Sequence, residues 1–310
     1  MSIFCVGQAA FDITAPYTGP LVANQKYRVL SPSYCPGAPA LNAACLCARW
    51  GAEVELVARI GDDAYGKRLK ETLTSCGVGM DHLLVGEDVS TSYSFIAVDD
   101  ASGERTIFNV PSQGDVVLPP LPSDSPSVIL SDGHEAEASL KIMEAFPHAY
   151  SIIDAGTYRE STYTVAREVD CIICSEDFAR QYTGRVLHDP DDLLEADSLL
   201  KDIERVNGGV AVITLGDRGL IYRDAQGRPI HMLAFPVEVV DTTGAGDIFH
   251  GAAAYGLERG WDLPTVLRVS SMASAISVGT MGSYSSIPEL EVVLELLGFT
   301  SNLDDASGSN

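Results

Sequence analysis

The most informative stretch of the sequence is Val239–Ala252, which reads VVDTTGAGDIFHGA. An apolar strand end runs into a Gly-Ala-Gly turn, and a helix rich in small residues follows from about Asp247 to Leu257. Glycines let a backbone come close to a ligand, and the free N–H groups at a helix start bind anions without a charged side chain. The pattern therefore predicts an anion-binding turn between a strand and a helix.

Asp247 would place a carboxylate in the first turn of that helix, beside the anion. Such a carboxylate can accept a proton from an incoming hydroxyl group. Phosphoryl transfer to an alcohol needs this deprotonation together with positioning and charge stabilisation. The residues alone also fit a simpler hypothesis, in which the glycines form a structural turn and Asp247 is only a first-turn helix residue.

The rest of the chain predicts an α/β protein. Apolar strand patterns alternate with helical patterns, which favours a three-layer α/β/α arrangement with a mostly parallel sheet. Two segments break the rhythm: residues 13–33 are extended and irregular, and residues 90–110 read as a β-hairpin. We expect a core, a small β-sheet lid and a flexible tail. Their ranges are 1–12, 34–89 and 111–300 for the core, 13–33 and 90–110 for the lid, and 301–310 for the tail.

The predicted core elements follow from the same patterns. The strands are Ile3–Val6, Glu53–Ala58, Val128–Leu130, Ser151–Asp154, Cys171–Cys174 and Val210–Thr214. The helices before the glycine-rich turn are Ala40–Trp50, Tyr65–Ser75, Glu137–Ala145 and Asp191–Val206.

Composition limits the partners and the compartment. The 310 residues carry 20 Lys+Arg and 43 Asp+Glu, a formal net charge of −23. Such a surface repels nucleic acid and anionic membranes, and no apolar run reaches the ~18 residues of a membrane span. The start of the sequence has no basic segment of a signal peptide. The odd number of cysteines, 7, is typical of reduced thiols. We expect a cytoplasmic protein with no nucleic-acid or membrane partner.

The string DTTGAGD, Asp241–Asp247, resembles the C-terminal signature of the ribokinase-like (PfkB) family of carbohydrate kinases. The resemblance implies an enzyme that uses ATP, with Asp247 as the catalytic base. It also implies that the amides of Gly244, Ala245, Gly246 and Asp247 form the anion hole for the γ-phosphate. Asp241 and Thr243 resemble the positions that hold a monovalent cation such as K⁺ in many members.

Two segments near the start resemble the acceptor side of the same family. Gly7–Asp12, GQAAFD, looks like the end of the first strand, which implies that Asp12 binds sugar hydroxyls. Residues 37–44, GAPALNAA, resemble the N-terminal signature, which implies that Gly37 approaches the sugar and that the Asn42 amide reads its hydroxyls. Ala38 stands where the family usually has a second glycine.

A later segment resembles the nucleotide side. Thr214–Gly219, TLGDRG, looks like the family loop that wraps the nucleotide, which implies contacts from Thr214, Gly216 and Gly219. Ser271 falls where the family often has an asparagine near adenine.

The chain departs from the family where many members carry N-x-x-E. Ser175 replaces the asparagine and Phe178 the glutamate that helps to hold Mg²⁺ through water. Glu176 is the substitute that we expect, with Asp177 as the alternative, because Mg²⁺ keeps several waters and tolerates a shifted carboxylate. A third possibility is that the metal depends more on the phosphates themselves.

The acceptor is expected to be an unphosphorylated pentose or hexose, phosphorylated on a primary hydroxyl, with Arg159 near its pocket. A phosphosugar acceptor stays open because Lys26, Arg28 and Arg105 are basic residues of the predicted lid. Two further hypotheses are a nucleoside acceptor and a sugar sensor without catalysis. The resemblance to the family also implies a homodimer formed through the lid sheets, and unpaired strand edges on the lid give a physical motive for it.

Overall fold

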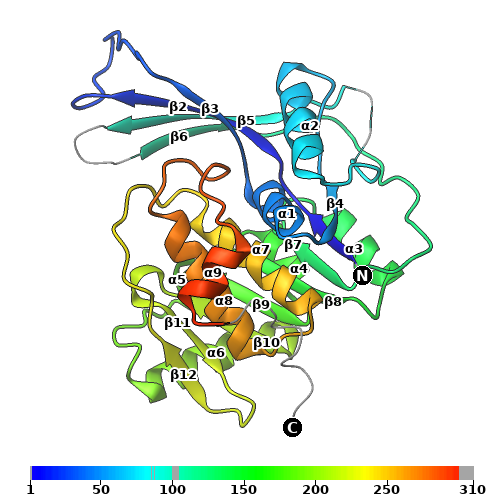
Figure 1. The fold of residues 1–310 in the computed structure, drawn as a ribbon, viewed down its shortest axis with the longest axis vertical. Helices are drawn as coiled ribbons and strands as arrows, with labels where there is room; N and C mark the ends of the chain where they lie inside the picture. The colour runs from blue at the N-terminus through cyan, green and yellow to red at the C-terminus, as the bar shows by residue number, and fades with distance from the viewer. Residues whose placement is uncertain (1, 85, 87, 100–104, 300–310) are drawn as a thin grey trace.

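A computed structural model of the chain describes residues 2–84, 86, 88–99 and 105–299 and is built around a mostly parallel sheet (Figure 1). Its strand order is β12-β11-β10-β9-β8-β7-β1-β4. Neighbouring strands from β10 to β4 run parallel, whereas β11 and β12 add antiparallel pairs at one edge. The bounds are β1 Ser2–Val6, β4 Glu53–Val57, β7 Val128–Ser131, β8 Tyr150–Ala155, β9 Cys171–Ser175, β10 Val210–Thr214, β11 Leu220–Arg223 and β12 Pro229–Met232.

Helices cover both faces of this sheet, because its strands are apolar on both sides. Ile3 packs into one hydrophobic cluster and the next residue, Phe4, into another, and Ile152 and Ile153 divide in the same way. The first face packs against α1 Pro39–Arg49, α2 Ala64–Cys76, α7 Ala245–Glu258, α8 Leu263–Ser277 and α9 Leu290–Leu296. The second face packs against α3 Ala136–Ala145, α4 Glu160–Ala166, α5 Glu176–Thr183 and α6 Leu193–Asn207. Two-sided burial is the usual state of parallel sheets, and the predicted three-layer α/β/α fold is confirmed.

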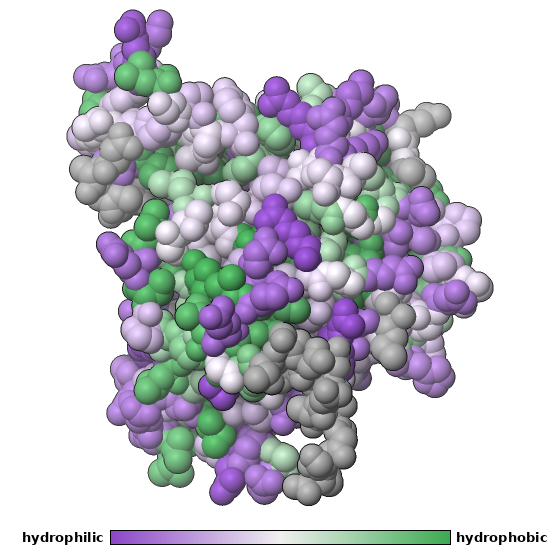
Figure 2. All heavy atoms as spheres, viewed as in Figure 1, coloured by the Kyte–Doolittle hydropathy of each residue, from purple (hydrophilic) through white to green (hydrophobic). Residues whose placement is uncertain are grey.

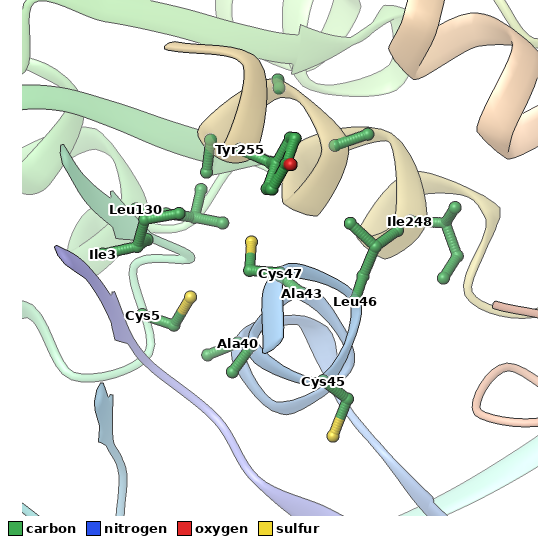
Figure 3. Packing of buried hydrophobic residues seen from close by; sticks show 14 of the residues in the cluster. Ile3, Cys5, Ala40, Ala43, Cys45, Leu46, Cys47, Leu130, Ile248 and Tyr255 are labelled. Atoms are coloured by element: carbon green, nitrogen blue, oxygen red, sulfur yellow. The ribbon is translucent and has the colours of Figure 1, made fainter. Parts of the chain in front are cut away.

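Small residues let α1 and α7 pack closely, and this contact positions the candidate site. A side chain at Gly251 would lie 2.9 Å from the Cα of Ala43, so only glycine fits there. Figure 3 shows α1 beside the helix that carries Ile248 and Tyr255, with the strand that carries Ile3 and Cys5 next to both. The cysteines of this region are free thiols.

The lid is a second sheet, with the strand order β3-β2-β5-β6, and it projects from the body as an arm (Figure 1). Its strands are β2 Ala10–Tyr17, β3 Ser33–Gly37, β5 Ser92–Asp99 and β6 Arg105–Val110. The pair β5–β6 is the predicted antiparallel hairpin. Strands β2 and β3 reach beyond the predicted lid range of residues 13–33. β2 begins at Ala10 and β3 ends at Gly37, and these two residues pair where the sheet meets the core. The predicted tail of residues 301–310 lies outside the described residues.

None of the helices in the described part of the chain has the length and apolar character needed to cross a membrane.

Candidate active site

The glycine-rich turn forms the start of α7, as the sequence predicts. Gly244 is the N-cap residue with φ of 78°, in the left-handed region that favours glycine. A Cβ at Gly244 would lie 2.4 Å from the Cβ of Ser283, so the neighbouring loop also excludes a side chain. The Ala245 amide donates to Thr242 O at 3.3 Å. First-turn amides have no acceptor one turn earlier in the helix, which makes the amides of Gly246 and Asp247 the natural anion donors here.

Asp247 is joined directly to the acceptor side of the predicted site. The Asn42 amide of α1 donates to Asp247 Oδ2 at 2.7 Å. Asp247 as a residue is partly exposed to solvent, but the surrounding protein removes most of the hydration of its carboxylate. This desolvation, with the negative charge of Asp154, raises the pKa of Asp247 to about 7, against the opposing effects of Asn42 and His250. A carboxylate with this pKa is suited to accept a proton near neutral pH.

Two more carboxylates, at the carboxyl ends of neighbouring strands, act on Asp247 electrostatically. Asp154 ends β8 as a buried residue, and its pKa is raised mainly by desolvation. Asp132 follows β7 and accepts from the backbone amides of Gln8 at 2.8 Å and Ala40 at 3.3 Å. Burial acts to raise the pKa of Asp132, but hydrogen bonds from the His134 side chain and from the backbone amides of Gln8 and His134 hold it below its usual value. Asp132 thereby ties the ends of β1, β7 and α1 together.

The predicted sugar-binding residues meet where the lid joins the core. Asp12 lies on β2, and a side chain at Gly37 would lie 2.0 Å from Asp12 Oδ2, so glycine leaves room for this carboxylate. Burial raises the pKa of Asp12, while a hydrogen bond with Ser94 lowers it. Ala38 has φ of 82°, a costly conformation for alanine at the position where glycine is usual in the family.

The two predicted arginines have different placements. Arg159 is the exposed N-cap residue of α4, and its guanidinium donates to His134 Nε2. His134 in turn stands beside Asp132, so Arg159 belongs to the rim of the acceptor side. Arg105 is opposite Val98, at the end of the β5–β6 pair away from Ser92, which bonds Gln8 of the core. The backbone register therefore separates Arg105 from the other acceptor residues.

The predicted nucleotide residues line one cavity of about 550 Å³ together with the start of α7. Thr214, Gly216, Gly219 and Ser271 all lie on its wall, as do Ala245 and Gly246. An apolar segment forms another part of the wall, and it was not predicted from the sequence because it has no motif of its own. Its members are Ala234, Phe235, Pro236, Val237 and Val239.

The residues predicted to hold a monovalent cation connect two loops. Asp241 Oδ1 accepts from the amide and the hydroxyl of Thr243 at 2.9 and 2.6 Å. Asp241 Oδ2 accepts from the Gly282 amide at 2.9 Å. This carboxylate thus ties the glycine-rich turn to the loop that carries Ser283. Within the residues that the structure describes, no group of three or more His, Cys, Asp or Glu side chains forms a metal cluster.

Glu176, the predicted substitute ligand for Mg²⁺, begins α5 and accepts from Arg218 Nη2 at 2.6 Å. Arg218 belongs to the nucleotide loop, so Glu176 lies beside the nucleotide side of the sheet. Ser175 caps α5 by accepting from the Phe178 amide at 3.0 Å, and the Phe178 side chain is fully buried. The two replaced family positions therefore have structural roles here.

The family assignment rests on a match that covers most of the chain. The model of the pfkB family carbohydrate kinases matches residues 1–290. The chain therefore belongs to the pfkB family of carbohydrate kinases, and the predicted ribokinase-like carbohydrate kinase is confirmed.

Individual relatives agree with this assignment over nearly their full lengths. The ribokinase of Bacillus subtilis is 25% identical over 96% of this chain and 99% of its own. The fructokinase of Klebsiella pneumoniae is 26% identical over 92% of this chain and 96% of its own. Among solved structures, the ribokinase of Thermotoga maritima superposes with a TM-score of 0.82 at 23% identity, covering 96% of this chain and 99% of its own. The Arabidopsis thaliana ribokinase, solved with ribose and ATP, gives 0.83 at 22% identity, covering 96% and 99%.

Proposed function

We propose that this carbohydrate kinase transfers the γ-phosphate of ATP to a primary hydroxyl of a pentose or hexose, with Asp247 as the general base. The observation that carries the proposal is the position of Asp247 between two sides of one site. Its helix start lines the nucleotide cavity through Ala245 and Gly246. Its carboxylate bonds Asn42 of the acceptor side at 2.7 Å.

The acceptor side is suited to a neutral polyhydroxyl ligand. The Oδ1 atom of Asn42 is buried and has no hydrogen-bond partner in the described part of the chain. A buried acceptor needs a donor, and a sugar hydroxyl beside Asp247 would supply one. The Asp12 carboxylate can accept from two further hydroxyls, and Gly37 leaves the space that this contact requires. Arg159 lies at the rim, where a polar group of the acceptor can reach its guanidinium.

The reaction follows from these placements. Asp247 accepts the proton of the sugar hydroxyl, whose oxygen attacks the γ-phosphorus while the bond to the ADP oxygen breaks. The first-turn amides of α7 stabilise the charge on the transferred phosphoryl group. Thr214, Gly216, Gly219 and Ser271 hold the rest of the nucleotide in the cavity of about 550 Å³.

The two cations implied by the family fit this chain unequally. For K⁺, Asp241 and Thr243 present the oxygen donors that such a cation takes, at the turn that binds the γ-phosphate. For Mg²⁺, the two carboxylates beside the replaced family position are already engaged: Glu176 by Arg218 and Asp177 by Arg180, each at 2.6 Å. They do not fit a protein-held magnesium site, so no step is assigned to one. Mg²⁺ would come with the phosphates of ATP.

A substrate screen tests this function. We expect ADP release to require an unphosphorylated pentose or hexose, with the new phosphate on the primary carbon of the product. ADP release would be measured for pentoses, hexoses, their phosphates and nucleosides, and the product by NMR. Turnover confined to phosphosugars or nucleosides would replace the proposed acceptor class. Sugar binding without turnover of any acceptor would support a sensor instead.

We also propose a homodimer that covers the apolar surface of the lid. Tyr34, Phe95 and Phe108 are large exposed residues on one face of this sheet, and Phe108 is 56% exposed. Phe95 and Phe108 pair across β5 and β6. Figure 2 shows green apolar atoms on the projecting arm, among polar ones. Exposed apolar strands of this kind are rare on stable monomers and favour association.

Sedimentation velocity would measure the dimer. We expect Phe108→Asp to convert it to a monomer, because a charge would be buried in the apolar contact. The matched control is Leu194→Asp on α6, a residue that is 83% exposed and far from the lid in the chain. It should leave the dimer intact. A wild-type protein that sediments as a monomer would contradict the proposal.

A further inference from the structure

His250 lies one turn along α7 from Asp247, with its ring buried between this helix and the central sheet. The residue is 4% exposed. Its Nδ1 atom is 2.6 Å from the carbonyl oxygen of Gly246 and 3.2 Å from Asp154 Oδ2. Its Nε2 atom is 3.2 Å from the carbonyl oxygen of Ile173, on β9.

These contacts determine how many protons the ring carries. Backbone carbonyl oxygens accept hydrogen bonds and cannot donate them, so each ring nitrogen must bring its own proton. A neutral imidazole has a single N–H and would direct the lone pair of its other nitrogen at a carbonyl oxygen in a buried site. The requirement holds whatever the state of Asp154, because the carbonyls of Gly246 and Ile173 impose it at both nitrogens.

We propose that His250 is held as a doubly protonated imidazolium and is a positioning residue for the reaction. Its positive charge and the negative charge of Asp154 together set the pH range in which Asp247 acts as the base. This inference rests on the proposed function of Asp247. The buried positive charge of His250 lies outside the family motifs on which the proposed function of Asp247 rests.

The elements packed against α7 bring several titratable groups to the surroundings of this ring. Asp154 comes from β8, and Asp132 follows β7. The thiols of Cys47 on α1 and Cys5 on β1 lie on the same side of the sheet, and Cys47 donates to Gly251 O. On α8, the uncharged Ser274 donates to Ala245 O. His134 and Arg159 act on Asp154 in the same sense as His250, but they lie closer to solvent. In this proposal His250 is therefore the buried positive charge among the carboxylates of Asp132, Asp154 and Asp247.

The two charges act on Asp247 in opposite directions. Asp154 raises the pKa of Asp247, whereas His250 lowers it. The physical reason is the same for both: a nearby negative charge disfavours the ionised carboxylate, and a nearby positive charge favours it. Removing either partner alone must therefore move the titration of the base, and the two removals must move it in opposite senses.

The first experiment measures the proton count directly in the intact wild-type protein, without substrate or turnover. Nitrogen-15 NMR of the imidazole rings, recorded from pH 6 to 9, separates protonated rings from neutral tautomers. The signal of His250 would be assigned among the 6 histidines as the one lost in His250→Gln and displaced in Asp154→Asn. We expect both its nitrogens to stay protonated at pH 7.5. A neutral tautomer at that pH would overturn the inference, whatever the enzyme's substrate proves to be.

The second experiment measures the pH dependence of kcat/KM. The wild type should lose activity tenfold per pH unit below about 7, where Asp247 becomes protonated. The acidic limb of this profile is the range in which kcat/KM falls as the pH is lowered. We expect it to move to higher pH by about one unit in His250→Gln and to lower pH by about one unit in Asp154→Asn.

The control for the second experiment is His188→Gln, which removes an exposed histidine paired with Glu195 and should leave the limb in place. Loss of packing alone would lower activity at every pH without displacing the limb. Shifts of the two variants in the same direction, or an unmoved limb in both, would overturn the role of the charges. If the NMR result holds and no acceptor is turned over, the failure lies in the proposed function and not in the charge state of His250.

Discussion

Asp247→Asn should lower kcat by about 10²–10⁴-fold, the usual effect of losing a general base. Asparagine has nearly the shape of aspartate and can still bond Asn42, which donates to the carboxylate at 2.7 Å in the native protein. It cannot take the proton of the sugar hydroxyl. The measurement is sugar-dependent ADP release at saturating ATP and sugar.

The controls separate catalysis from binding and folding. Calorimetric titration should show that the variant still binds sugar and nucleotide, and thermal unfolding should show no loss of stability. Asp124→Asn makes the same chemical change at an exposed loop residue and should retain wild-type kcat. An Asp247→Asn enzyme with full activity would remove Asp247 from the role of base.

Gly244→Ala should damage both stability and activity, although it adds only a single methyl group. The new Cβ would lie 2.4 Å from the Cβ of Ser283, and φ at this position is 78°. The left-handed backbone and the overpacking together should lower the free energy of unfolding by about 2–4 kcal/mol. Displacement of the turn should also lower kcat/KM by about 10²-fold, because small errors in placing the phosphate are costly.

Gly208→Ala is the matched control, because it separates the backbone cost from the clash. Gly208 ends α6 with φ of 70°, and a Cβ there would have no heavy atom within 4 Å. This variant should lose only about 1 kcal/mol of stability and retain full activity. Unfolding by urea and the coupled kinase assay measure both variants. If the two variants matched in stability and activity, Ser283 would not restrict the turn.

Much of the fold could be predicted because its strands are buried on both faces. The apolar runs that became β1, β4, β7, β8, β9 and β10 are continuous, as expected for a parallel sheet. The long amphipathic helices α1, α2, α3 and α6 were found within a few residues for the same reason. The short helices α4 and α5 were not predicted, because too few turns were present to establish a period. The antiparallel edge of β11 and β12 also has weak patterns.

Only part of the candidate site could be predicted from the sequence, because a motif contains residues that are neighbours in the chain and does not show which residues are neighbours in space. The motifs pointed to Asn42 and Asp247 separately, and the packing of α1 on α7 brought them to 2.7 Å. Asp132 carried no motif, although it bonds the backbone of Gln8, 124 residues earlier. His250 was inside the quoted stretch, but its role depends on β8 and β9. Asp132 and Asp154 each lie at the carboxyl end of a predicted strand, and this position was the signal that could have identified them.

The lid also has a consequence for the order in which the chain folds. β5 and β6 are neighbours in sequence and can pair early, but β2 pairs in parallel with β5, so that Ala10 lies beside Ser92. The chain between those residues contains α1, β4 and α2, which belong to the body. Closing so long a loop is entropically costly until those elements have docked and brought the two strands together. The arm is therefore completed late in folding and opens before the body does. The proposed acceptor side, which includes Asp12 on β2, is therefore completed only after α1, β4 and α2 have docked.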